Sequence, residues 1–397
     1  GANGLANAGE AARQVDLNDQ PYKRLPPVMN TNKGPAIIDK RFPARLANEP
    51  FLVDQYVRHN QTTGDLVHRF YQEQMQINDG KMNKFAAVSD AGGLTMGYYD
   101  FAHSAHWQLA QTYTLADNAF HSAFGGSFLN HAFLVCACAF EWKNADASLV
   151  AKLDANGKLL KDGQVSPDGY AINTARSVYL HAPNDVNPAK LVPPQTLPNI
   201  GDRLTQKGVS WKWYGGGYRD ALAGKPDAEF QFHHQPLAYF KNYAPGTELQ
   251  KQHLQDQADF YADIANNQLP QVVFYKPIGE LNLHPGYANI KNGDAHLAEI
   301  MAKLQASPAW QTMLVIVTFD ENGGIWDHVA PPKRDRWGPG TRVPLILAGP
   351  GVKRNFVDHT QYETVSILKT IEERFGLEPL NEIDKNANSL RSALISD

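Results

Sequence analysis

The feature that most constrains the fold is a continuous apolar run, Met313–Phe319 (MLVIVTF), bounded by polar residues and followed directly by Asp320 and Glu321. A short run without polar alternation is typical of a strand buried on both faces, as in a parallel sheet. Another short apolar segment, Gln271–Lys276, precedes it, and between the two we expect a helix capped by Asp294. The order is therefore strand, helix, strand.

The rest of the chain continues this alternation with long insertions. Arg342–Ala348 is a further strand candidate, and a helix is expected from about Gln361 to Phe375. Residues 1–60 and 156–198 are rich in turn-forming residues and are expected to form loops. Since no linker divides the chain, we predict one α/β domain over residues 1–397, with a mainly parallel central sheet flanked by helices and long loop insertions.

Charge and hydropathy exclude two classes of partner. The chain has 37 Lys and Arg against 41 Asp and Glu, a net charge of −4, and its cations are scattered along the sequence. Because nucleic-acid binding needs a concentrated basic face, we expect no nucleic-acid partner. The apolar runs are far shorter than the ~18–20 residues that a membrane-spanning helix requires, so we expect no membrane span.

The chain has only two cysteines, Cys136 and Cys138. On a helix or a strand, an i, i+2 spacing is unsuited to an unstrained disulfide. We therefore predict that the two thiols are unpaired and buried as small apolar groups.

Asp320 and Glu321 lie where ligands collect in an open parallel sheet, at the carboxyl end of a strand. Two adjacent carboxylates repel each other unless a cation lies between them or one keeps its proton. The pair therefore indicates a divalent metal with oxygen ligands, and a simple acidic turn is the alternative. Asp327 and His328, a few residues later, favour the metal.

Histidine is the second chemical signal, since the chain has 14 of them. His233 and His234 are adjacent, and His284 follows the predicted strand Gln271–Lys276 in a loop with Pro and Gly. An imidazolium donates two hydrogen bonds and can protonate a leaving oxygen, which suits a phosphate substrate. For any single histidine, a packing or surface role is the ordinary alternative.

Ser127 is the third signal, because it follows two glycines and precedes apolar residues at helical spacing. At a helix N-terminus, backbone N–H groups favour an alkoxide or a phosphate oxyanion. The alternative is a serine that only caps the helix. The Gly-x-Ser-x-Gly motif of serine hydrolases does not occur here, so that template does not fit.

Together these segments resemble the bacterial phosphoesterase family that contains acid phosphatases of the respiratory-burst-inhibiting type and the haemolytic and non-haemolytic phospholipases C. The resemblance covers most of the chain and implies an alkaline-phosphatase-like α/β fold. It also implies a secreted or periplasmic location. The segments that carry it include Asp65-x-x-His68, Met96–Tyr99, Gly125–Ser127, His284–Gly286 and Asp320–Gly324 with Asp327 and His328.

The resemblance implies roles for individual residues. Ser127 would be the nucleophile, where the phospholipases usually carry Thr, and would bind one divalent metal ion together with Asp320 and Glu321. The residues implied to surround the phosphate are His68, His233, His234 and His284, with Asp327 and His328 at or just behind the site. His59 matches no motif of the family and is a weaker candidate.

One family motif has no counterpart in this sequence. In the family, a first strand ending in Glu-Asn-Arg-Ser-Phe-Asp precedes a segment like Gly1–Gly4, and its Glu and Asn supply further metal ligands. We expect either that this strand is absent or that it is retained as a cleaved, noncovalently bound N-terminal peptide.

The resulting prediction is hydrolysis of phosphate monoesters through a phosphoserine intermediate, as in an acid phosphatase, with His284 protonating the leaving oxygen. A phospholipase C that cleaves phospholipid headgroups is the first alternative, because it would use the same chemistry on a diester. A non-catalytic phosphate-binding protein is the second. The expected partner is a small phosphate ester or a phospholipid.

Overall fold

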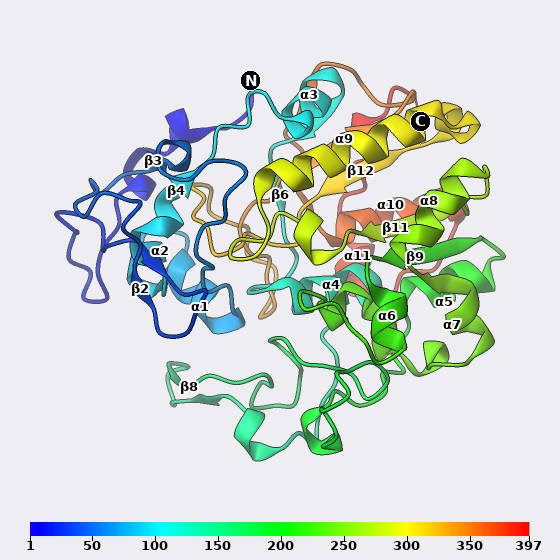
Figure 1. The fold of residues 1–397 in the computed structure, drawn as a ribbon, viewed down its shortest axis with the longest axis horizontal. Helices are drawn as coiled ribbons and strands as arrows, with labels where there is room; N and C mark the ends of the chain where they lie inside the picture. Colours follow the sequence, from blue (N-terminus) through cyan, green and yellow to red (C-terminus); the bar gives the residue numbers. More distant parts are fainter. Residues whose placement is uncertain (397) are drawn as a thin grey trace.

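The computed structural model describes residues 1–396 and has two sheets at its centre (Figure 1). One is wholly parallel, in the order β10-β9-β11, with β10 at Leu254–Gln255, β9 at Trp211–Gly215 and β11 at Val272–Lys276. The other is mixed, in the order β12-β13-β5-β14, with β12 at Val315–Thr318, β13 at Leu345–Ala348, β5 at Thr114–Ala116 and β14 at Phe356–Asp358. The predicted α/β class and the three predicted strands are confirmed.

Strand β13 runs antiparallel to both of its neighbours, β12 and β5. A parallel neighbour needs a long crossover, usually a helix, whereas the chain between β12 and β13 contains only turns and loop. The strand therefore returns directly beside β12, which makes this sheet mixed. In the same sheet β14 is parallel to β5.

Short two-stranded pairs are placed around this centre. They are β1 (Met29–Asn30) with β2 (Ile37–Ile38), β3 (Phe51–Leu52) with β4 (Gly97–Tyr98), β6 (Ala119–Phe120) with β15 (Tyr362–Glu363), and β7 (Lys152–Leu153) with β8 (Leu159–Lys161). The first pair is an antiparallel hairpin in the N-terminal part of the chain.

Eleven α-helices occur within residues 1–396. They are α1 (Phe70–Ile77), α2 (Phe85–Val88), α3 (Ala105–Thr112), α4 (Ser127–Cys136), α5 (Ile200–Gln206), α6 (Tyr218–Leu222), α7 (Glu248–His253), α8 (Gln257–Ala265), α9 (Ile290–Ala306), α10 (Val365–Phe375) and α11 (Glu382–Lys385). None of the described helices is long and apolar enough to cross a bilayer.

The longest of these, α9, begins one turn earlier than the sequence suggested. Asn289 caps it by accepting a hydrogen bond from the Asn292 backbone N–H at 2.8 Å. Asp294 therefore lies inside α9, and its carboxylate accepts hydrogen bonds from the first backbone N–H groups of α3 instead. The prediction that Asp294 caps its own helix was wrong, because an earlier Asn takes that place.

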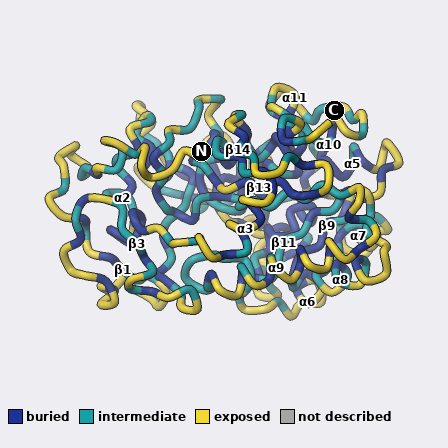
Figure 2. Tube along the Cα trace, turned by 90° about the horizontal axis from the view of Figure 1, so that it is seen from above, coloured by how far each residue is buried: buried dark blue, intermediate teal, exposed yellow. Residues whose placement is uncertain are grey.

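All residues of β13 and most residues of α4 are buried, and Figure 2 colours the chain by burial. Helix α4 is apolar on nearly all sides and packs between the aromatic residues of the parallel sheet and α10. A helix that is hydrophobic all round must lie inside the protein, so α4 fixes Ser127 at the end of a rigid, buried element.

Strand β12 is less buried than its apolar sequence predicts, since every residue of the strand is only partly buried. Within the described chain it pairs with β13 on one side only, and β11 likewise pairs with β9 only. Both strands are therefore sheet edges. The expectation that Met313–Phe319 is buried on both faces was wrong, because that burial depends on a second neighbouring strand.

Cys136 and Cys138 form a disulfide, with their Cα atoms 5.1 Å apart. The intervening Ala137 ends α4 in the left-handed conformation, at φ 50°. This turn brings the two Cβ atoms together, which neither a continuing helix nor a strand would do. The prediction of unpaired thiols was wrong because it considered only those two regular conformations.

Candidate active site

The loop before α4 places Ser127 close to the segment that carries His68. Gly125 has φ +99°, and a Cβ there would lie 2.6 Å from the Phe70 nitrogen; a Cβ on Gly126 would lie 2.8 Å from the His68 carbonyl oxygen. Only glycine allows this close backbone approach. Ser127 is the first residue of α4, so its hydroxyl lies at the N-terminus of that helix.

Ser127 meets the predicted metal ligands at this point. Its Oγ donates a hydrogen bond to Glu321 Oε1 at 3.4 Å, and Glu321 Oε2 accepts one from the Gly323 backbone N–H at 2.7 Å. Asp320 lies beside them, directly after β12 and Phe319. The structure therefore brings Ser127, Asp320 and Glu321 together, as the sequence predicted.

The Lys276 ammonium group and the His131 ring both approach Asp320. Its Oδ2 atom lies 3.6 Å from Lys276 Nζ and 3.6 Å from His131 Nδ1. This oxygen is buried and has no hydrogen-bond partner within residues 1–396. Burial by itself raises the pKa of Asp320, but Lys276, neighbouring histidines and the Ser127 hydroxyl together lower that pKa by more, so the carboxylate stays ionised.

The pKa of Glu321 shifts in the opposite direction. Burial raises the pKa of Glu321, and the neighbouring Asp320 charge adds to this increase. Two carboxylates in contact cannot both ionise cheaply without a cation between them. The unpartnered Asp320 oxygen and the proton-retaining tendency of Glu321 therefore fit a divalent cation bound by oxygen ligands.

A buried cluster of three histidines lies on one side of this carboxylate pair. His131 stacks on His234, with ring centroids 5.3 Å apart, and its ring is 5.6 Å from that of His233. Burial lowers the pKa of His233 and His234 well below the ordinary value, and burial together with Lys276 lowers the pKa of His131 to about 4. At neutral pH these rings are uncharged, in contrast to the imidazolium donors expected from the sequence.

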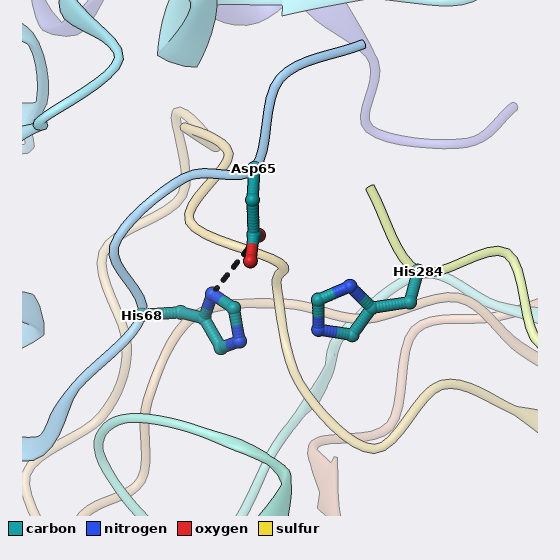
Figure 3. Close-up of side chains that lie close together, drawn as sticks. All are labelled: Asp65, His68 and His284. Atoms are coloured by element: carbon teal, nitrogen blue, oxygen red, sulfur yellow. Dashed lines mark ion pairs between the residues drawn. The ribbon is translucent and has the colours of Figure 1, made fainter. Parts of the chain in front are cut away.

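A second cluster, Asp65, His68 and His284, lies near the same carboxylates (Figure 3). One potential ligand atom of each residue lies within 4.8 Å of the others, and the two histidine rings are 5.2 Å apart. Burial lowers the pKa of His68, but the charges of Glu321 and Asp65 raise it by more. His68 is therefore the histidine best suited to carry a positive charge toward a bound anion.

The Nδ1 atoms of His68 and His284 both face backbone carbonyls. They lie 2.5 Å from the Leu66 oxygen and 2.6 Å from the Pro285 oxygen, respectively. Each contact is a hydrogen bond only if the ring nitrogen carries the proton. The Nε2 atom of each ring is therefore the one available to a substrate.

The remaining predicted residues face other parts of the molecule. Arg342 donates two hydrogen bonds to Asp327, at 2.9 and 3.0 Å, and His328 Nε2 lies 2.9 Å from Asn3 Oδ1. Both thus fix the N-terminal segment. His59 pairs with Asp54 at 2.9 Å, away from both histidine clusters.

Three residues of this region were missed by the sequence reasoning. His131 lies one helical turn after Ser127. Lys276 is the last residue of strand β11, a position comparable to that of Asp320 after β12. The positions of His131 and Lys276 in the sequence could therefore have identified both residues. Glu73 carries no such local signal. Its buried carboxylate accepts hydrogen bonds from the Gly125 backbone N–H at 2.9 Å and from Asn322 Nδ2 at 2.9 Å, and so connects the serine loop to the metal-ligand turn.

Comparison with known proteins identifies similar sequences over most of the chain. The sequence model of the Phosphoesterase family matches residues 12–378. "Phospholipase C B" of Mycobacterium tuberculosis (strain ATCC 25618 / H37Rv) is 27% identical over 333 residues, which cover 77% of this chain and 56% of that protein. "Non-hemolytic phospholipase C" of Pseudomonas aeruginosa is 24% identical over 387 residues, covering 88% and 49%. The chain thus spans about half the length of the curated relatives it matches.

Among solved structures, a protein in the alkaline phosphatase superfamily from Vibrio parahaemolyticus is similar over 75% of this chain and 65% of that one. The sequence identity is 12% and the TM-score is 0.38.

Proposed function

Since the chain belongs to the phosphoesterase family, we propose that it hydrolyses phosphate esters, with Ser127 as the nucleophile and with one divalent metal ion bound by Asp320, Glu321 and Ser127. The observation that carries this proposal is the position of the Ser127 hydroxyl, at the N-terminus of a buried helix and 3.4 Å from Glu321 Oε1. A phosphate oxygen bound there would meet the free backbone N–H groups of the first turn of α4.

The reaction would proceed in two in-line displacements. In the first, Ser127 Oγ attacks phosphorus and forms a phosphoserine, while the bond from phosphorus to the leaving oxygen breaks. In the second, water attacks the same phosphorus atom and releases Ser127. A bound divalent cation would lower the pKa of the serine hydroxyl and offset charge on a phosphate oxygen.

The two histidine clusters would divide the remaining tasks. We assign protonation of the leaving oxygen to His284 through Nε2, because its Nδ1 faces the Pro285 carbonyl. His68, as a cation, would bind an oxygen of the bound phosphate. The neutral His233 and His234 would each donate one hydrogen bond to a phosphate oxygen.

Asp320 and Glu321 supply only part of a complete metal coordination shell. We propose that further ligands, from a segment carrying the Glu-Asn motif of the family, complete it. Two observations support this: β11 and β12 are both unpaired along one edge, and the apolar side chains of β12 are only partly buried. Intact-mass analysis together with metal titration tests this proposal, since a protein that lacks such a segment and still binds metal at full stoichiometry would refute it.

Between the two substrate classes, we propose monoester hydrolysis first, because Ser127 stands where the phospholipases usually carry Thr. The printed names of the relatives support the alternative, a phospholipase C. Turnover of p-nitrophenyl phosphate against p-nitrophenylphosphorylcholine separates the two. A protein that binds vanadate but turns over neither substrate would be a phosphate-binding protein.

We also propose a secreted or periplasmic location. The Cys136–Cys138 disulfide supports it, because disulfides persist in oxidising compartments. Fractionation of the native host, with immunodetection of the protein, tests this location.

Two substitutions test the proposed site. We expect Ser127→Ala to abolish turnover while the protein still binds a divalent ion in titration calorimetry, because the change removes one neutral ligand only. Asp320→Asn should lose both metal binding and turnover. Residual activity of Ser127→Ala within about tenfold of the wild type would rule out the covalent route, and full metal binding by Asp320→Asn would show that the carboxylate pair is only structural.

A further inference from the structure

The β1–β2 hairpin presents apolar side chains to solvent. Ile37 and Ile38, which form β2, are 66% and 56% exposed, and the preceding Pro35 and Ala36 are exposed as well. Scattered exposed apolar residues are ordinary, but a contiguous group at the end of a hairpin marks an interaction surface. In Figure 1 this hairpin lies at the outer edge of the molecule beside α1 and α2.

The same part of the chain is strongly basic, although the net charge of the whole chain is negative. Residues 21–46 contain six cations and one acid, a net charge of +5 in a chain whose total is −4. The exposed cations are Lys23, Arg24, Lys33, Lys40, Arg41 and Arg45. The single acid, Asp39, is buried and forms an ion pair with Arg41 at 2.8 Å. Lys33 and Lys40 have no acidic partner in the described structure.

The loop that connects β1 to β2 is part of the wall of the candidate active site. Thr31 Oγ1 donates a hydrogen bond to the Asp65 carbonyl oxygen at 3.1 Å, and Asn32 Oδ1 accepts one from the Asp65 backbone N–H at 2.9 Å. Asp65 belongs to the cluster with His68 and His284 (Figure 3). A surface that binds the hairpin would therefore be held close to the reacting groups.

We propose that the β1–β2 hairpin docks on an anionic lipid surface. Ile37 and Ile38 would enter the headgroup region, and the surrounding cations would contact lipid phosphates. Charge complementarity favours this partner, because the two exposed isoleucines are close in sequence to the unpaired cations Lys33 and Lys40, and an anionic membrane is an apolar layer covered by negative charge. The inference rests on the proposed function, and it favours the phospholipase alternative, because a docked membrane would bring lipid phosphate esters close to Ser127.

Sedimentation with lipid vesicles tests the docking directly. The protein should sediment with equimolar phosphatidylcholine–phosphatidylglycerol vesicles, and the bound fraction should fall as salt increases. It should not sediment with pure phosphatidylcholine. The double variant Ile37→Ser/Ile38→Ser should bind at least about tenfold more weakly, and so should Lys33→Glu/Lys40→Glu. Equal binding by the wild type and the isoleucine variant would overturn the proposal.

A matched control is available on a different part of the surface. Leu160 and Val186 are 66% and 77% exposed, and neither belongs to the basic segment. The variant Leu160→Ser/Val186→Ser should bind vesicles like the wild type, and an equal loss of binding in this control would overturn the role of the hairpin.

The experiments can distinguish failure of the docking proposal from failure of the proposed function. Hydrolysis of soluble p-nitrophenyl phosphate should be unchanged in the isoleucine variant, because both substituted side chains are exposed to solvent. A wild type that binds anionic vesicles but turns over no ester would support docking and overturn the proposed function. A wild type that turns over the soluble ester but binds no vesicles would overturn docking alone.

Discussion

Glu73→Gln is the substitution whose effect the structure determines most fully. Glu73 lies on α1 and is 1% exposed. Its Oε1 accepts a hydrogen bond from the Gly125 N–H, and its Oε2 accepts from Asn322 Nδ2 and lies 2.8 Å from His121 Nε2. Glutamine would remove the charge and replace one acceptor oxygen with an N–H₂ group facing these donors.

The size of the effect follows from the partner histidine. Burial lowers the pKa of His121, but the charge and the hydrogen bond of Glu73 raise it by more, to about 9. The ordinary value is about 6.5, and each pKa unit corresponds to about 1.4 kcal/mol, so the pair contributes on the order of 3 kcal/mol to stability. Breaking a buried ion pair costs a similar amount, about 3–5 kcal/mol. We therefore expect Glu73→Gln to lower the free energy of unfolding by about 3 kcal/mol.

The pH dependence gives a sharper test than the size alone. The folded pKa of His121 lies above its unfolded value, so this stabilisation is fully present below about pH 6.5 and is lost as the pH rises through about 9. The difference between wild type and Glu73→Gln should therefore be largest near pH 6 and shrink toward pH 9. Urea unfolding followed by tryptophan fluorescence measures it at each pH. A loss below about 1 kcal/mol near pH 6, or one that grows with pH, would refute the reasoning.

Glu372→Gln is the matched control, because Glu372 is also buried but neither of its carboxylate oxygens has a hydrogen-bond partner within residues 1–396. Burial, with Asp384 adding to it, raises the pKa of Glu372 to about 9. The folded state keeps this proton while the unfolded chain ionises above about pH 4.5, so Glu372 destabilises the fold increasingly up to about pH 9. Glu372→Gln should therefore stabilise the protein at neutral pH, opposite to Glu73→Gln.

Two further predictions concern the site. A chelator should abolish hydrolysis of p-nitrophenyl phosphate, and titration with divalent ions should restore it; unchanged turnover in metal-free protein would contradict the metal role of Asp320 and Glu321. Gly125→Ala should abolish turnover and lower the melting temperature, because its Cβ would lie 2.6 Å from the Phe70 nitrogen, whereas Gly157→Ala, also at positive φ but with nothing within 4 Å, should retain activity. Similar behaviour of the two variants would show that the close approach at Gly125 is unimportant.

The features that the sequence predicted are local ones. Apolar runs located β11, β12 and β13, and the residues directly after a strand or before a helix identified Asp320, Glu321 and Ser127. Each of these depends only on neighbouring positions in the chain. The periodicity of short segments was therefore enough to place the candidate site residues on their elements.

The features that the sequence did not predict depend on distant segments. The burial of β12 depends on which strands lie beside it, and Glu73 contacts Asn322 from 249 positions away. The basic character of residues 21–46 is invisible in the total charge, because acids elsewhere compensate it. A single sequence contains no signal for contacts that form only when remote segments pack together.

Glu73 and Asp320 are both buried carboxylates, but the hydrogen bonding of their oxygens differs. This difference indicates which carboxylate supports the structure and which is available for the proposed chemistry. Glu73 has both oxygens occupied, by backbone, amide and imidazole groups, so a metal ion could bind there only by displacing them. Asp320 is ionised, and its buried Oδ2 has no hydrogen-bond donor within residues 1–396. The Lys276 ammonium group, 3.6 Å away, offsets part of its charge but leaves the oxygen free to coordinate a metal ion. Since Glu73 holds Gly125 and Asn322 in place, it fixes the distance between Ser127 and the carboxylate pair. Glu73 thus supports the geometry of the candidate site, and Asp320 is the carboxylate that we propose as the metal ligand.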